Sequence, residues 1–213
     1  MKYLIILFGA PGCGKGHLSE QIIKVLNEKI SPDEIFYIST GDLIRNEIAN
    51  ESEIGKQIKE LVQSGQLVPD NIVDTLVAQA INRDEYVKIL DGYPRTSSQL
   101  DFLAKQLKDE KGKITVLTIF RDTPEEVILE RVKKRRVCAK CKKTHTVDDG
   151  CCPHCGGESI IRKDDAVIEA RLEAYKKNTL PLWDKIDSIS HTLRVDGLRE
   201  SEEVAREIIE ILL

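Results

Sequence analysis

The stretch YLIILFGAPGCGKGH, residues 3–17, joins an apolar run to a glycine-rich turn and then to a helical pattern. In the spacing Gly9-x4-Gly14-Lys15, the glycines let successive backbone N–H groups converge on phosphate oxygens, and the lysine adds a positive charge. The positive end of the following helix also favours an anion. The stretch therefore predicts a phosphate-binding loop between the first strand and the first helix. The alternative is a glycine turn with a purely structural role.

Five apolar runs alternate with helical patterns along the chain. Uninterrupted apolar runs of this kind are typical of parallel strands that are buried on both faces. We therefore predict an α/β fold with a five-stranded parallel sheet and helices on both faces. A helical stretch near 41–82 and a cysteine-rich segment near 136–162 interrupt the alternation and are expected to cover the carboxyl edge of the sheet. The predicted strands are residues 3–8, 35–39, 87–90, 114–120 and 191–195, and helical patterns cover 17–28 and 123–134.

The composition is that of one globular domain. Of the 213 residues, 41% are hydrophobic and 32% are charged, and the formal net charge is -4. This balance excludes a disordered acidic chain and a globally basic nucleic-acid binder. No apolar run approaches the roughly 20 residues of a membrane span, and the N-terminal run is too short for a signal peptide. We expect a cytoplasmic protein whose partners are small molecules.

Four cysteines have the spacing of a metal site. Cys138-x2-Cys141 and Cys152-x2-Cys155 are separated by ten residues, and two such pairs are typical of a tetrahedral four-thiolate Zn²⁺ site. A closed set of four protein ligands indicates a structural metal. Cys151 is then a spare thiol, although Cys151, His145 or His154 would serve in an altered site.

Two polar residues follow the third predicted strand. Asp91 ends this strand beside the predicted phosphate site, where a carboxylate could hold Mg²⁺ through water. Arg95, in the turn DGYPR (91–95), could bind a phosphate with two parallel hydrogen bonds. The simpler alternatives are a carboxylate in a strand-end turn and a surface arginine.

The loop GxxxxGKG, the segment STGDLIR (39–45) and the segment LDGYPRTSSQ (90–99) together resemble the adenylate kinase family, and the resemblance spans the whole chain. It implies a P-loop kinase fold over 1–213, with a helical insertion for the nucleoside monophosphate at 40–69 and a zinc-binding lid at 136–162. The implied activity is reversible phosphoryl transfer from ATP to AMP, giving two ADP. The implied cofactors are Mg²⁺ with ATP and a structural Zn²⁺. The expected oligomeric state is a monomer.

The resemblance also assigns residues to the two nucleotides and to catalysis. Gln99 would read the adenine edge, and Asp164 and Asp165 would tie the lid to its hinge. Thr40 could instead cap a helix. The ATP side would comprise Gly12, Cys13, Gly14, Lys15, Gly16, His17, Arg131, Arg135 and Arg199. The AMP side would comprise Thr40, Arg45, Gln66, Leu67, Val68, Gly92, Tyr93, Pro94, Arg95, Gln99, Arg162 and Arg171. Catalysis would use Lys15, Asp91, Arg95, Arg135, Arg162 and Arg171.

Several positions depart from the family pattern. His17 stands where a threonine is expected, and it either contacts nucleotide phosphate or is a tolerated replacement. Lys134 replaces a hinge glycine, and His145 stands where a tyrosine is expected. The segment between Asp165 and Arg171 is shorter than usual.

Two other functions compete with this interpretation. One is a kinase for UMP or CMP, against which Thr40 and Gln99 argue. The other is a zinc-ribbon nucleic-acid-binding ATPase, suggested by the basic residues between Lys133 and Lys143, which include Lys142. A phosphate loop elsewhere in the chain makes polyphosphate the expected anion, so we do not expect nucleic acid as a partner.

Overall fold

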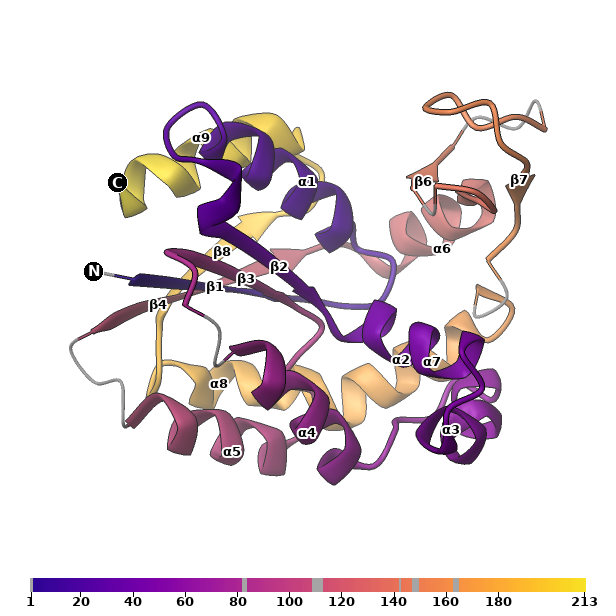
Figure 1. The fold of residues 1–213 in the computed structure, drawn as a ribbon, viewed down its shortest axis with the longest axis horizontal. Helices are drawn as coiled ribbons and strands as arrows, with labels where there is room; N and C mark the ends of the chain where they lie inside the picture. Colours follow the sequence, from indigo (N-terminus) through magenta and orange to yellow (C-terminus); the bar gives the residue numbers. More distant parts are fainter. Residues whose placement is uncertain (1, 82–83, 109–112, 142, 147–149, 163–164) are drawn as a thin grey trace.

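A parallel sheet of five strands forms the centre of the molecule, in the order β2-β3-β1-β4-β8 (Figure 1). The computed structural model describes residues 2–81, 84–108, 113–141, 143–146, 150–162 and 165–213. All the strands predicted for the sheet are confirmed, to within two residues at each end. Their bounds are β1 Lys2–Phe8, β2 Ile35–Ser39, β3 Val87–Asp91, β4 Ile114–Asp122 and β8 His191–Asp196.

The register of the sheet brings three connections together at one edge. In the register, Leu7 of β1 pairs with Asp91 of β3, and Phe8 pairs with Phe120 of β4. Parallel strands end at the same edge, so the connection after β1 lies between those after β3 and β4. The phosphate-binding loop predicted from the sequence therefore has Asp91 on one side and the end of β4 on the other.

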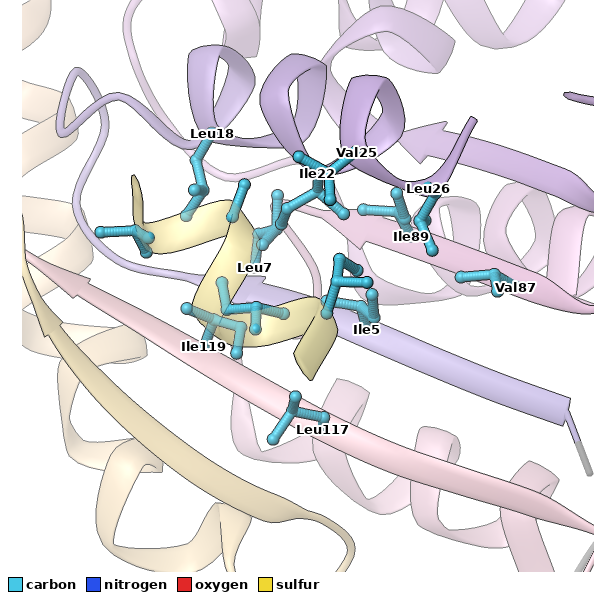
Figure 2. Close-up of a cluster of buried hydrophobic side chains, with 14 of the residues drawn as sticks. Ile5, Leu7, Leu18, Ile22, Val25, Leu26, Val87, Ile89, Leu117 and Ile119 are labelled. Carbon is cyan, nitrogen blue, oxygen red and sulfur yellow. The ribbon is translucent and has the colours of Figure 1, made fainter. Parts of the chain in front are cut away.

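Helices cover both faces of the sheet (Figure 1). Alternate residues of a strand point to opposite faces. Ile5 and Leu7 accordingly pack in the cluster that contains α1 and α9 (Figure 2), whereas Leu4 and Ile6 pack with α4 and α5. The helices of the two layers are α1 Lys15–Leu26 and α9 Ser201–Leu212 on one face, and α4 Asp70–Ile81, α5 Ser97–Lys108 and α8 Trp183–Ile186 on the other.

The helical interruption begins directly after β2. The short helix η1 (Pro32–Glu34) precedes β2, and α2 (Thr40–Ala49) and α3 (Glu53–Gln63) lead from β2 to α4. Gly55 lets these two helices approach closely, because a Cβ atom at this position would lie 2.1 Å from the backbone oxygen of Glu47. The predicted helical stretch is therefore confirmed over its described residues.

The cysteine segment forms a separate small sheet. Helix α6 (Glu125–Lys134) leads into β5 (Arg136–Cys138), which pairs antiparallel with β6 (Thr144–His145) and β7 (Ser159–Ile160). This small sheet stands away from the central sheet (Figure 1). The chain returns through α7 (Ile168–Ala174), a π-helical turn η3 (Tyr175–Thr179) and η4 (Leu180–Leu182). Lys142 and Asp164, which the sequence singled out, lie outside the described residues.

Among the helices that the structure describes, none is both long and apolar enough to cross a membrane. The proposed limits of the two insertions, 40–69 and 136–162, stay predictions.

Candidate active site

The loop after β1 has the strand–turn–helix geometry of an anion-binding site. Gly14 adopts a left-handed conformation (φ 98°) directly before Lys15, the first residue of α1. Lys15 Nζ donates hydrogen bonds to the backbone oxygens of Gly9 (2.8 Å) and Ala10 (2.9 Å). Backbone N–H groups at the start of a helix have no partner within the helix and favour an anion. The loop predicted from the sequence thus has the required geometry.

The same loop packs tightly against α6. A Cβ atom at Gly12 would lie 2.8 Å from side-chain carbons of both Ile128 and Val132, so a glycine is required here. Cys13 is fully buried, and the backbone oxygen of Gly16 accepts a hydrogen bond from Ser19. These predicted loop residues are held in place by packing.

Two arginines lie beside Gly14 at the end of β4 and on α6. Arg131 donates to the backbone oxygens of Cys13 (3.2 Å) and Gly197 (2.9 Å). Arg121 is buried and donates to Ser201 Oγ (2.8 Å) and to the backbone oxygens of Gly197 and Arg199 (3.2 Å each). Burial lowers the pKa of the Arg121 guanidinium from its usual value.

Arg121 is not among the site residues predicted from the sequence. The available signal was an arginine at the carboxyl end of an otherwise apolar run.

Two further residues assigned to the ATP side have protein partners. The Arg199 guanidinium binds Glu207 (3.0 Å) and Glu203 (3.3 Å) of α9. The His17 side chain is 62% exposed, and its Nδ1 lies 3.7 Å from Glu20 Oε2. Their contacts with nucleotide stay predictions.

A second polar centre lies at the end of β3. Asp91 Oδ2 accepts a hydrogen bond from the Tyr37 hydroxyl (3.0 Å). Burial and the nearby Asp91 carboxylate raise the pKa of Tyr37 above its usual range. Thr40 Oγ1 reaches the backbone oxygens of Asp91 (3.1 Å) and Gly92 (2.9 Å).

The alternative in which Thr40 caps a helix is wrong. Ser39 caps α2, because its Oγ accepts from the backbone N–H of Asp42 (3.2 Å). Thr40 is the first residue of α2 and is buried.

Arginines from distant parts of the sequence gather at this second centre. Arg95 donates from Nε to the backbone oxygen of Gly92 (2.7 Å). Burial, together with the positive charges of Arg171, Arg45 and Arg162, lowers the pKa of Arg95 to about 10, while Asp91 acts in the opposite direction. A cluster of guanidinium groups is a favourable site for a phosphate. The structure thus brings together the predicted Arg45, Arg95, Arg162 and Arg171.

Gln99 forms hydrogen bonds on both sides of its amide. Oε1 accepts from the backbone N–H of Arg95 (2.7 Å), and Nε2 donates to Asp70 Oδ1 (2.9 Å). Asp70 Oδ2 also accepts from Thr96 Oγ1 (2.7 Å). Asp70 is not among the site residues predicted from the sequence, because it lies 29 positions before Gln99 and belongs to no motif.

The remaining residues assigned to AMP lie in the turn after β3 and in the connection between α3 and α4. Tyr93 is buried, and its hydroxyl donates to Asp74 Oδ1 and lies 3.2 Å from the backbone oxygen of Gln99. The peptide bond between Tyr93 and Pro94 is cis. Gln66, Leu67 and Val68 connect α3 to α4, and Val68 is buried.

Four sulfur atoms converge in the small sheet. The Sγ atoms of Cys138, Cys141, Cys152 and Cys155 all lie within 4.8 Å of one another. Cys138 and Cys155 are 3.5 Å apart, and Cys141 and Cys152 are 3.7 Å apart. Thiolates at about 2.3 Å from a tetrahedral Zn²⁺ lie roughly 3.8 Å apart, so the cluster fits this ion.

Backbone N–H groups support the cluster. Those of Cys141 and Lys140 donate to Cys138 Sγ (3.3 Å each). Together with the neighbouring thiols of Cys155 and Cys141, they lower the pKa of Cys138 to about 6, which favours the thiolate that a metal requires. Cys151 is exposed and is not one of the four converging cysteines. His145 is buried, and its Nε2 lies 3.2 Å from Ser159 Oγ.

The base of the small sheet is closed by an ion pair. Arg135 binds both carboxylate oxygens of Asp165, with Nε to Oδ2 at 2.8 Å. The predicted link between the cysteine segment and its hinge is therefore present at Asp165.

The chain matches the family model described as "Adenylate kinase" over residues 7–190. The chain belongs to the adenylate kinase family. Adenylate kinase of Fervidobacterium nodosum is 35% identical over 98% of this chain and 96% of its own. The adenylate kinase of Clostridium tetani is 36% identical over 98% of this chain and 97% of its own. That of Thermotoga maritima is 34% identical over 100% of this chain and 97% of its own. The family predicted from the three motifs is confirmed.

Membership of the adenylate kinase family makes this chain a nucleotide phosphotransferase. The P-loop kinase fold expected for an adenylate kinase is present, with its parallel sheet and its cysteine cluster. No finding favours a UMP or CMP kinase or a nucleic-acid-binding ATPase.

Proposed function

We propose that this chain transfers the γ-phosphoryl group of ATP reversibly to AMP, with ATP on the loop after β1 and AMP at the arginine cluster after β3. The observation that carries the proposal is the adjacency of these two centres. Strands β1 and β3 are neighbours, and Leu7 pairs with Asp91 in their register. Two anion-binding centres at adjacent strand ends suit a reaction that moves a phosphoryl group between two nucleotides.

The chain's own contribution to the reaction is positioning and charge neutralisation. Phosphoryl transfer spreads negative charge over the transferring group and requires little covalent chemistry from the protein. Lys15 would neutralise charge on the ATP side, and Arg95, Arg162 and Arg171 would do so between the nucleotides. Arg131 and Arg135 would contact ATP, and Arg45 and Thr40 would hold AMP.

Two metal ions belong to the proposal. Asp91 ends β3 beside the loop and would hold Mg²⁺ through water, a common arrangement for this ion. Bound Mg²⁺ supplies charge neutralisation at the phosphates. The Cys138, Cys141, Cys152 and Cys155 cluster would hold a structural Zn²⁺, whose binding energy would stabilise a segment too small to build its own core.

The two insertions would act as covers. Residues 40–69 would close over AMP and residues 136–162 over ATP, so that water is excluded from the transferred group. A monomeric state and a cytoplasmic location stay predictions.

Two substitutions test the assignment of the two centres. Arg95→Ala should raise the KM for AMP by about 100-fold and leave the Kd for ATP within about twofold, because its guanidinium serves the second nucleotide. Lys15→Met should lower kcat by about 1,000-fold without loss of AMP binding. Arg206→Ala, at an exposed arginine that pairs with Glu28 and Glu202, is the matched control. Equal losses of ATP and AMP affinity in Arg95→Ala would contradict the proposal.

A further inference from the structure

We propose that Asp70 fixes the direction of the Gln99 amide and thereby determines which base the monophosphate site accepts. The inference rests on the proposed function, in which Gln99 reads the base of AMP. Asp70 would be a positioning residue, acting through Gln99.

The two neighbours of the Gln99 amide leave it one orientation. An ionised carboxylate only accepts hydrogen bonds, and a backbone N–H only donates them. Asp70 therefore requires the amide nitrogen on its side (2.9 Å), and Arg95 requires the amide oxygen on the other (2.7 Å). A reversed amide would set oxygen against the Asp70 carboxylate and N–H against N–H.

The carboxylate is itself held in place. Asp70 begins α4, and Thr96 Oγ1 donates to its Oδ2 (2.7 Å) while accepting from the backbone N–H of Gln99 (3.2 Å). Asp70, Thr96 and Gln99 thus form a closed set of hydrogen bonds between α4 and the start of α5. Gln99 is 2% exposed, so water would not compensate a mismatched amide.

A fixed amide selects between purines. The bond to Asp70 uses one of the two amide N–H groups, and the bond from Arg95 uses one of the two lone pairs of the amide oxygen. One donor and one acceptor are therefore left for a base. Adenine offers an acceptor at N1 and a donor at its 6-amino group, which complement this pair. Hypoxanthine reverses both groups, with a donor at N1 and an acceptor at O6. A site that pairs polar groups rejects the reversed pattern strongly, because buried groups are then left unpaired.

The test compares AMP with inosine monophosphate (IMP), which carries hypoxanthine. We would measure the Kd of each by calorimetry, together with the KM for ATP, in wild type, Asp70→Ala and Asp70→Asn. Asp101→Asn is the control, because Asp101 is an exposed carboxylate on α5. We expect the preference for AMP over IMP to fall about tenfold in Asp70→Ala, where nothing opposes the reversed amide on this side. The KM for ATP and the preference in Asp101→Asn should not change.

Asp70→Asn keeps the size of the side chain and decides the matter if Asp70→Ala fails to fold. Asparagine can turn either its oxygen or its NH₂ group to Gln99, so the preference should again fall, but less. If both Kd values rise by the same factor in the variants, Asp70 is only structural and the inference is wrong. If wild type binds AMP and IMP equally well, the inference is also wrong. Absence of AMP phosphorylation by wild type would instead overturn the proposed function.

Discussion

Arg135 and Asp165 join the two ends of the cysteine segment through both oxygens of one carboxylate. Arg135 follows the last residue of α6, and Asp165 lies shortly before α7. Their side chains are only 16% and 5% exposed, so neither charge is well solvated. A buried pair of this kind costs most when one partner alone is removed.

Asp165→Ala should therefore lower the free energy of unfolding by about 3 kcal/mol, because it removes the carboxylate that neutralises the largely buried Arg135 guanidinium. Urea unfolding without nucleotide measures this loss. The double variant Arg135→Met/Asp165→Leu should recover most of it, since no charge is then left unpaired. A loss below about 0.5 kcal/mol in Asp165→Ala would show that the pair is not structural.

Removal of the metal should destabilise the small sheet. Cys138→Ser should lower the thermal midpoint and reduce bound Zn²⁺, because the remaining three sulfurs no longer close the site. Chelation should reproduce the effect in wild type. Cys151→Ser is the matched control, since Cys151 lies outside the converging group. Equal damage in both variants, or purified protein without Zn²⁺, would reject the ligand assignment.

Arg121 should affect the binding of ATP and leave the proposed AMP site at the end of β3 unchanged. Arg121→Met removes the donors to Ser201 and to the backbone oxygens of Gly197 and Arg199. Because Gly197 also accepts from Arg131, we expect a stability loss of about 2 kcal/mol and a KM for ATP raised about tenfold, with the KM for AMP unchanged. Arg194→Met, at an exposed arginine paired with Asp122, is the control. An unchanged KM for ATP would show that Arg121 has no part in the ATP site.

His17 should be replaceable by the threonine of the family pattern. Its ring is largely exposed and contacts Glu20, so His17→Thr should change the free energy of unfolding by less than about 0.5 kcal/mol. We expect the KM for ATP to stay within about threefold of wild type. A larger change, measured at fixed free Mg²⁺, would indicate that the imidazole contacts the nucleotide.

The sheet could be predicted from the sequence because its signal is local. Five short strand-like runs, of which residues 3–8 and 114–120 are the most continuously apolar, sufficed to place its five strands. The glycine spacing before Lys15 located the loop. The spacing within and between the two cysteine pairs likewise indicated the metal site. In each case the residues that act together are close in sequence or repeat a regular pattern.

The supporting residues could not be predicted, because their partners are distant in sequence. Asp70 meets Gln99 and Tyr37 meets Asp91 only after the chain has folded. In the sequence, Arg121 is only a residue near the end of a strand. Its role depends on Gly197 and Arg199 in the connection after β8, which contact it only in the folded chain. Thr40 is of a residue type that caps helices well, but α2 begins at Thr40 itself, so the cap is Ser39.

Phosphoryl transfer to a panel of monophosphates tests the central claim most directly. With ATP and Mg²⁺ held saturating, ADP formation would be measured with AMP, UMP, CMP and GMP as acceptors. We expect a kcat/KM for AMP at least about 100-fold above that for each of the other monophosphates, because Gln99 and the arginine cluster accept the adenine and the phosphate of AMP together. An equal or higher kcat/KM for UMP or CMP would contradict it.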